Sequence, residues 1–188
     1  MKALKELLSA HYPLPEHDWE MVEGKFFRED ITKNQIIVSK GQIENYLYFI
    51  EKGILRAWLD HGEKEITFDF HFENSIYSSY TSFLTRKPSG FHVQAITGMV
   101  LWKIHYDDLQ LVYEQTDTGQ IIGRKSAEML FKDKSKREID LLSKSPRQLY
   151  LDLFTEQPEL ISQIPLKYIA SYIGVTPQAL SRIRKRIY

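Results

Sequence analysis

The sequence predicts an α+β protein with three parts: an N-terminal antiparallel β-barrel or jelly roll, a long helix, and a C-terminal helix-turn-helix. From Phe26 to Ile104, short apolar and β-branched runs alternate with turn residues, which is typical of many short strands. After Asp107 the helical period returns and continues to about Leu142. Near the C-terminus, two short helical segments flank Gly174.

The composition restricts the class of protein. The 188 residues contain no cysteine, which excludes disulfides, thiolate nucleophiles, Cys-ligated zinc and iron–sulfur clusters. The chain has no run of about eighteen apolar residues, and its first residues are too charged for a signal peptide, so we expect a cytoplasmic protein. Residues 144–188 carry seven Lys/Arg against three Asp/Glu, whereas residues 1–143 carry eighteen against twenty-two. Contact with a polyanion is therefore expected only at the C-terminal end.

The N-terminal two thirds of the chain contain the expected helices and strands of the barrel domain. Two short amphipathic helices are predicted over Lys2–Ala10 and His17–Glu23. Strands are predicted over Ile36–Val38, Tyr46–Ile50, Ile54–Leu59, Ile66–Phe72, Val93–Ile96 and Val100–Ile104. Turn signals separate them at Gly41, Lys52-Gly53, residues 61–63, residues 88–90 and Gly98.

The long helix is expected to begin at Thr116 or Thr118 and to occupy about residues 117–143. Its apolar positions are Ile121, Ile122, Gly123, Ala127, Met129, Leu130, Ile139 and Leu142. Because this face is too wide for one contact, we expect one side to cover the barrel and the other to pair with a second copy of the chain in a two-fold dimer.

A domain boundary is expected just after this helix. Ser145 followed by Pro146 is a helix-start signal, and the proline disfavours one continuous helix. We therefore expect a barrel domain with its dimerisation helix over residues 1–143 and a helix-turn-helix domain over residues 144–188. The second domain is predicted to contain helices over Arg147–Phe154 and Pro158–Ile164 before the final motif.

The final motif shows helix signals on both sides of a turn. Ile169, Ala170 and Ile173 share one face of a first helix, and Gly174 ends it. Thr176 is expected to cap the second helix, and Pro177 suits its first position because the missing N–H costs nothing there. In the second helix the apolar positions that face the first are Ala179, Leu180, Ile183 and Ile187.

The opposite face of the second helix carries groups that suit DNA. Arg and Gln can each make two hydrogen bonds to one base edge, and Thr, Ser, Arg and Lys suit phosphates. The candidate DNA-binding residues are Thr176, Pro177, Gln178, Ser181, Arg182, Lys185, Arg186 and, from the first helix, Lys167. The spacing alone also fits a plain helical hairpin with a basic end.

These parts together resemble one known family. Residues 38–58 and 169–185, joined through a long helix, are similar to the corresponding segments of the Crp/Fnr transcriptional regulators. Gly41 and Gly53 bracket a strand pair as in cyclic-nucleotide-binding barrels, and residues 62–65 match the family's hairpin turn. The resemblance implies a cyclic-nucleotide-binding-like domain, a homodimer, a pseudo-palindromic DNA operator and RNA polymerase as a partner.

The resemblance also assigns the base-reading positions, which would be Pro177, Gln178 and Arg182. Pro177 has no side-chain donor or acceptor, and Gln178 favours a different base from the glutamate common in the family, so the operator should differ. Many relatives continue into a β-hairpin wing, whereas this chain ends at Tyr188. We therefore expect a helix-turn-helix that lacks most of the wing.

The effector pocket that the resemblance implies departs further from the family. Relatives hold the ribose with a Gly-Glu pair and the cyclic phosphate with an Arg-Ser pair. At these places the chain has Tyr77, Ser78, Ser79 and Tyr80, and then Ser89, Gly90 and Phe91. A buried anion needs a cation and hydrogen-bond donors, so we expect that cyclic AMP is not the effector. A neutral, aromatic-compatible ligand and a barrel closed by its own side chains remain as alternatives, with no cofactor expected.

Two other functions compete with a non-enzymatic regulator. A cupin-like barrel enzyme would bind a metal through His and Glu, but His71 and Glu73 are the only suggestive pair and lack a closely spaced second histidine. A barrel used only for protein interaction, with a non-functional helix-turn-helix, is the other alternative. The basic residues Arg182, Arg184, Lys185 and Arg186 argue against this alternative, because a decayed DNA surface has no reason to stay basic.

Overall fold

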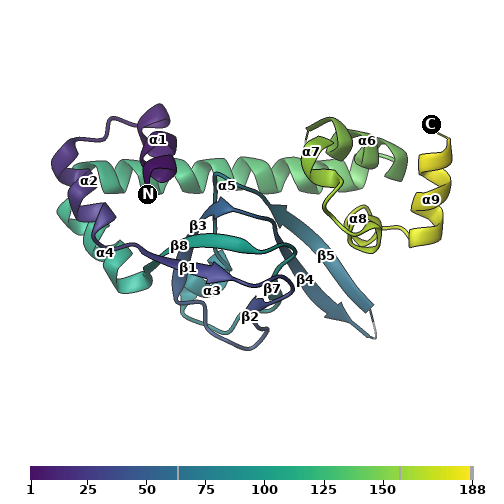
Figure 1. Cartoon of the computed structure of the whole chain (residues 1–188), viewed down its shortest axis with the longest axis horizontal. Helices are drawn as coiled ribbons and strands as arrows, with labels where there is room; N and C mark the ends of the chain where they lie inside the picture. Colours follow the sequence, from purple (N-terminus) through teal and green to yellow (C-terminus); the bar gives the residue numbers. More distant parts are fainter. Residues whose placement is uncertain (63, 157, 187–188) are drawn as a thin grey trace.

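The structure, a computed structural model, describes residues 1–62, 64–156 and 158–186. Its elements are α1 (Lys2–His11), α2 (Glu16–Glu23), β1 (Phe27–Ile31), β2 (Ile36–Val38), β3 (Tyr46–Lys52), β4 (Leu55–His61), β5 (Lys64–His71), β6 (Ser75–Tyr77), α3 (Tyr80–Thr85), β7 (His92–Ala95), β8 (Met99–His105), α4 (Tyr106–Gln115), α5 (Asp117–Ser143), α6 (Pro146–Glu156), α7 (Pro158–Ile161), α8 (Leu166–Tyr172) and α9 (Pro177–Lys185). Figure 1 shows the long α5 beside the sheets, with α1, α2 and α4 around one end and α6 to α9 at the other. The α+β class is confirmed.

The strands form the expected antiparallel barrel of two packed sheets. Within the described chain the strand orders are β1-β8-β3-β6 and β2-β7-β4-β5, and neighbouring strands run antiparallel. Inward-facing side chains of the two sheets share a core that includes Ile50, Leu55, Ala57, Val93 and Leu101, all closed to solvent. The hairpin turn at Gly62 joins β4 to β5, and Glu63 of that turn lies outside the described residues.

The sequence does not predict β1, β6 or α3, and it indicates helical period after Asp107 without separating α4 from the long helix. Strand β1 reads Phe-Arg-Glu-Asp-Ile, and Ile31 alone among its residues is buried, so it shows almost no apolar signal. Helix α4 begins in a polar stretch, where Asp107 and Asp108 stand in its first turn and favour the positive end of the helix dipole. Together with α1 and α2, α4 encloses a second core that contains Leu4, Trp19, Phe83, Ile104 and Leu109.

Helix α5 begins where the sequence predicts, with Thr116 rather than Thr118 as its cap. The Thr116 hydroxyl accepts a hydrogen bond from the Gly119 N–H over 2.9 Å. With 27 residues, the helix is about 40 Å long at 1.5 Å per residue. Several of its large apolar side chains are mostly exposed in the single chain: Phe131 is 73% exposed, Ile139 62% and Leu142 83%.

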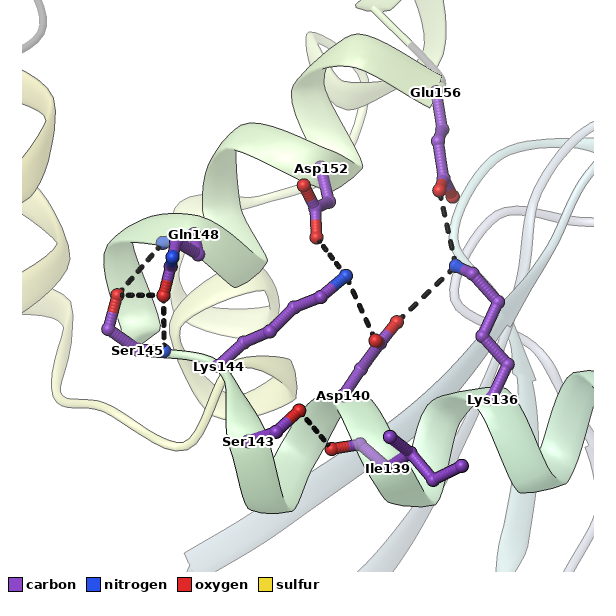
Figure 2. A network of polar contacts seen from close by, with 9 residues as sticks. All are labelled: Lys136, Ile139, Asp140, Ser143, Lys144, Ser145, Gln148, Asp152 and Glu156. Carbon is purple, nitrogen blue, oxygen red and sulfur yellow. Dashed lines mark hydrogen bonds and ion pairs between the residues drawn. The ribbon is translucent and has the colours of Figure 1, made fainter.

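Helix α5 ends at Ser143 and α6 begins at Pro146, and Figure 2 shows the polar contacts of this junction. The Lys144 ammonium lies 2.9 Å from Asp140 of α5 and 2.6 Å from Asp152 of α6, so it joins the two helices. Ser145 starts α6 as expected, because its hydroxyl accepts from the Gln148 backbone N–H. In return, the side-chain amide oxygen of Gln148 accepts from the backbone N–H and the hydroxyl of Ser145. These exposed ion pairs orient α6 more than they stabilise it.

The C-terminal helices pack against the barrel through an interface that we call the α8–β5 interface. Strand β5 is at the edge of its sheet, so one row of its backbone groups has no strand partner in the described chain. Ser171 of α8 meets this row. Its hydroxyl accepts from the Thr67 N–H over 2.9 Å and donates to the Glu65 carbonyl over 2.9 Å.

Arg56 of β4 forms the polar centre of the α8–β5 interface and is 1% exposed. Its guanidinium forms an ion pair with Glu65 and donates to Thr67 and Gln94 over 3.1 Å each. The guanidinium carbon also lies 3.6 Å from the ring centroid of Tyr168 on α8. Around it, one apolar core includes Ile54, Phe70 and Ile96 of the barrel region together with Leu149, Ile169, Ala170 and Leu180 of the C-terminal helices.

Candidate nucleic-acid interface and barrel pocket

Helices α8 and α9 form the predicted helix-turn-helix. Ile169, Ala170 and Ile173 are buried, and Leu180 of α9 is closed to solvent against them. Gly174 has a φ of +75°, a left-handed conformation that suits glycine, and the turn closes when the Val175 N–H donates to the Ala170 carbonyl over 2.9 Å. The packing of the first helix on the second therefore follows the spacing of the apolar residues.

The start of α9 also follows its sequence signals. The Thr176 hydroxyl accepts from the Ala179 N–H over 3.2 Å, and Pro177 occupies the first helical position. A capped N-terminus fixes the direction in which the first turn of α9 projects. This matters because residues in the first turns of a recognition helix reach base edges.

The candidate DNA-binding side chains lie on one exposed surface of this motif, which we call the α9 polar face. Its members are Thr176, Pro177, Gln178, Ser181, Arg182, Lys185 and Arg186, and all are exposed. Lys167 of α8 is exposed as well, and its ammonium lies over the Tyr168 ring at 4.8 Å. The surface thus presents Gln and Arg, which match base edges, beside Lys and hydroxyl groups, which match phosphates.

Arg184 does not belong to the α9 polar face, although the basic run in the sequence includes it. It is half-buried and turns toward α6, α7 and α8. Its Nε atom is buried and has no hydrogen-bond partner in the part of the chain that the structure describes. The interpretation of four basic residues as one surface is therefore wrong for Arg184, because consecutive helical residues project about 100° apart.

In the barrel pocket, two serines stand where the family resemblance places a glutamate and an arginine. Ser79 is closed to solvent and Ser89 is 4% exposed, and their Oγ atoms lie 3.0 Å apart. The Ser89 hydroxyl also lies 2.8 Å from the Phe91 carbonyl. Both hydroxyls thus have partners within the chain, and the neighbouring Ser78 hydroxyl donates to the Tyr46 carbonyl over 3.0 Å.

A buried carboxylate that the sequence analysis does not identify, Glu44, completes this pocket. Glu44 is 2% exposed, and its carboxylate accepts from the Tyr48 hydroxyl over 2.9 Å and from the Tyr46 N–H over 3.0 Å. The Ser79 N–H lies 3.5 Å from the same carboxylate. Burial raises the pKa of Glu44, while hydrogen bonds from Tyr46 and Tyr48 act in the opposite direction. A side-chain acceptor of the chain itself therefore already faces the Ser79 amide.

Arg86, the nearest cation, has other partners. Its guanidinium donates to the Glu44 carbonyl oxygen over 2.7 Å and to the Asn45 side chain, and it stacks on the Tyr106 ring at 4.5 Å. It is half-buried, and its backbone has a left-handed φ of +56° at the end of α3.

The aromatic residues proposed for the pocket lie in three different places. Phe91 packs edge-on against Phe68 at 4.9 Å beside the barrel core, and Tyr77 is buried in that core. Tyr80 instead stacks near Phe83 in the core under the N-terminal helices. Phe70 lies against Tyr172 of α8. The structure thus brings together Ser79, Ser89 and Phe91, which are linked by hydrogen-bond distances, and leaves Gly90 exposed.

The suggested metal pair is not assembled. His71 lies 3.3 Å from Asp69, whereas a Glu73 oxygen accepts from the Gly53 N–H. Burial opposes ionisation of Asp69, but His71 and Lys134 outweigh it and lower the pKa of Asp69 to about 2. Among the described residues, no group of three His, Asp or Glu side chains has a geometry that could hold a metal ion.

The searched helices include none that is long and apolar enough to cross a membrane.

Comparison with known proteins agrees with this geometry. Residues 28–116 match the cyclic nucleotide-binding domain family. A protein from Eubacterium rectale assigned to the crp/fnr family of transcriptional regulators superposes with a TM-score of 0.72 at 17% identity, over 93% of this chain and 83% of that one. The chain has the fold of the Crp/Fnr regulators. The resemblance drawn from the sequence is confirmed at that level.

Two further structures share the Crp/Fnr fold with this chain. FixK2 from Bradyrhizobium japonicum gives a TM-score of 0.72 at 14% identity, over 86% of this chain and 84% of its own. A double mutant of CooA from Carboxydothermus hydrogenoformans gives 0.68 at 17% identity, over 88% of this chain and 78% of its own. A search of the curated proteins found no match.

Although residues 28–116 match the cyclic nucleotide-binding domain family, we expect the protein not to bind cyclic AMP or cyclic GMP. The Ser79–Ser89 pair offers no guanidinium to a cyclic phosphate, and the Ser79 N–H already lies 3.5 Å from a Glu44 side-chain oxygen. Titration calorimetry should therefore show no binding up to about 1 mM, where the binding free energy is only about −4 kcal/mol. A cyclic-nucleotide-binding relative in the same buffer serves as the positive control. A micromolar dissociation constant would contradict this prediction.

Proposed function

We propose that the protein is a dimeric DNA-binding transcriptional regulator of the Crp/Fnr type, whose effector is not a cyclic nucleotide. The α9 polar face carries this proposal: a capped helix presents Gln178, Ser181 and Arg182 to solvent beside Lys185 and Arg186. These side chains combine base-edge donors with phosphate contacts on one surface. The charge of residues 144–188, seven basic against three acidic, agrees with a polyanionic partner at this end.

The dimer is proposed from the surface of α5. Ile121, Phe131, Ile139 and Leu142 are between 38% and 83% exposed, which leaves large apolar side chains in water along most of the helix. At 100° per residue, these four positions fall within about a quarter of the helix circumference. A second copy of the chain packed on this stripe would bury it and would relate the two α9 helices by a two-fold axis.

The division of labour follows the chain order. We assign sensing and dimerisation to residues 1–143 and DNA binding to residues 144–188. The α5–α6 junction supports this assignment, because the backbone leaves the long helix at Ser143 and restarts at the Ser145 cap. The extensive core shared across the α8–β5 interface means that the two units are packed together rather than connected only by a linker.

The proposal predicts the kind of DNA that the protein selects. From a pool of random duplexes, the full chain should enrich a pseudo-palindrome whose half-sites are about 34 Å apart, because a two-fold dimer presents α9 to successive major grooves. Arg182→Ala should cost about 1–3 kcal/mol and relax preference at one base pair, whereas Lys185→Ala should weaken all sequences alike and lower the salt slope by about one.

Lys185 is the matched control for Arg182, because both are exposed on α9 and both carry one positive charge. Uniform loss of affinity in both variants would show that Arg182 contacts a phosphate instead of a base. Equal affinity for a single half-site and for the full operator, or a monomer at binding concentrations, would count against the dimeric regulator itself.

A further inference from the structure

A cavity lies within the C-terminal helices, away from the barrel pocket. Its volume is about 210 Å³, and its wall is formed by residues of all four helices and their connections: Tyr150, Phe154, Pro158, Ile161, Ser162, Ile164, Leu166, Ile169 and Arg184. The cavity is partly open to solvent, since Pro158 and Ser162 of its wall are exposed. A concave site lined mostly by apolar side chains with one cation is a candidate binding site.

Arg184 is the charged group in this wall, and its environment is unusual for an arginine. The buried Nε–H has no hydrogen-bond acceptor among the described side chains, which do not include that of Glu159. A buried donor without a partner is unfavourable, and a guanidinium prefers a planar, two-oxygen acceptor. The remaining wall is largely aliphatic and aromatic, with Phe154, Ile161 and Ile164 among its members. The cavity thus combines an apolar body with one unsatisfied cationic donor.

We propose that this cavity binds a small aromatic carboxylate, with the ring among the apolar side chains and the carboxylate accepting hydrogen bonds from Arg184. The size agrees, because an apolar cavity of about 150 Å³ accommodates benzene and 210 Å³ leaves room for one additional carboxylate group. The ligand would contact α9 through Arg184, which lies outside the α9 polar face. Any change in operator affinity on ligand binding rests on the proposed function, whereas binding of the ligand to this cavity does not.

Benzoate is the simplest probe of this site. Calorimetry with the full chain and no DNA should show saturable binding of one benzoate per chain, with a dissociation constant below about 1 mM. Benzyl alcohol, which has the same ring without the charge, should bind at least about tenfold more weakly. Arg184→Gln should weaken benzoate binding at least about tenfold, because a charged hydrogen bond is lost, and should leave benzyl alcohol binding unchanged.

Two further variants separate the site from general effects. Lys185→Gln removes a charge from the adjacent, exposed position on α9 and should leave benzoate affinity unchanged. Ile164→Phe adds volume to the cavity wall and should abolish binding of both probes, with circular dichroism used to verify folding. If that variant does not fold, the comparison of Arg184→Gln with Lys185→Gln still tests whether Arg184 binds the carboxylate.

Absence of saturable benzoate binding would overturn the proposal, as would equal benzoate affinity in the wild type and Arg184→Gln. A similar loss in Lys185→Gln and Arg184→Gln would also overturn it, because it would show attraction by net charge alone. Since the assay contains no DNA, failure to bind an operator leaves these results unaffected. Conversely, a protein that selects the pseudo-palindrome and ignores benzoate retains the proposed function without this site.

Discussion

Replacing Arg56 by alanine is expected to lower the free energy of unfolding by about 3 kcal/mol, because breaking a buried ion pair and emptying a packed site each cost several kcal/mol. Arg56 is 1% exposed, lies 3.6 Å from the Tyr168 ring and bonds to side chains of the barrel. Its loss removes contacts on both sides of the α8–β5 interface. The two parts should then unfold at different denaturant concentrations instead of together.

Urea denaturation followed by two probes measures this effect, with Arg28→Ala as the matched control. Arg28 also pairs with a carboxylate, that of Asp30, but both side chains are about half exposed or more. Removing an exposed pair of this kind should cost about 0.2–1 kcal/mol. Similar losses in the two variants would mean that Arg56 does not join the barrel to the C-terminal helices.

The second large effect is expected for Gly53→Ala between β3 and β4. The backbone there has a φ of +100°, and an added Cβ would stand 2.7 Å from the Gly98 carbonyl oxygen and 2.7 Å from Met99 Cγ. Backbone strain of about 1–3 kcal/mol adds to a similar cost of overpacking, so we expect a loss of about 3 kcal/mol or more in the free energy of unfolding.

Gly41→Ala is the control for this substitution, and the measurement is the midpoint of urea denaturation. Gly41 has a similar φ of +88°, but no described atom lies within 4 Å of an added Cβ. It should therefore show the backbone strain without the steric contact. If Gly41→Ala is as destabilising as Gly53→Ala, the contacts of the added Cβ with Gly98 and Met99 do not contribute to the loss of stability.

The parts of the fold that follow from local chemistry could be predicted from the sequence. Thr116 and Thr176 are helix caps because their hydroxyls accept neighbouring N–H groups, and no distant contact is needed for that. Most strands of the barrel follow from apolar alternation. Strand β1 escapes prediction because three charged residues, Arg28 to Asp30, precede its single buried residue, Ile31.

The candidate sites are less predictable, because they depend on contacts between distant segments. In the sequence, Arg56 looks like any polar residue in a strand. Its contact with Tyr168, which is more than a hundred residues later in the chain, appears only in the folded structure. Arg184 belongs to a basic run, and its burial becomes visible only when α6 and α7 are placed beside α9. Glu44 faces Ser79 only because β3 and the start of α3 are brought together. By contrast, the exposed residues of α9 follow from helical spacing alone.

The Ser171 hydroxyl has a consequence for solubility. It occupies the Thr67 N–H and the Glu65 carbonyl on the open edge of β5, and those groups can otherwise pair with a strand from another molecule. Any event that lifts α8 from the barrel therefore uncovers a template for intermolecular sheet growth. The helix that packs against the proposed DNA-reading helix thus also protects the barrel from self-association, so loss of the proposed DNA binding and loss of solubility would begin with the same movement.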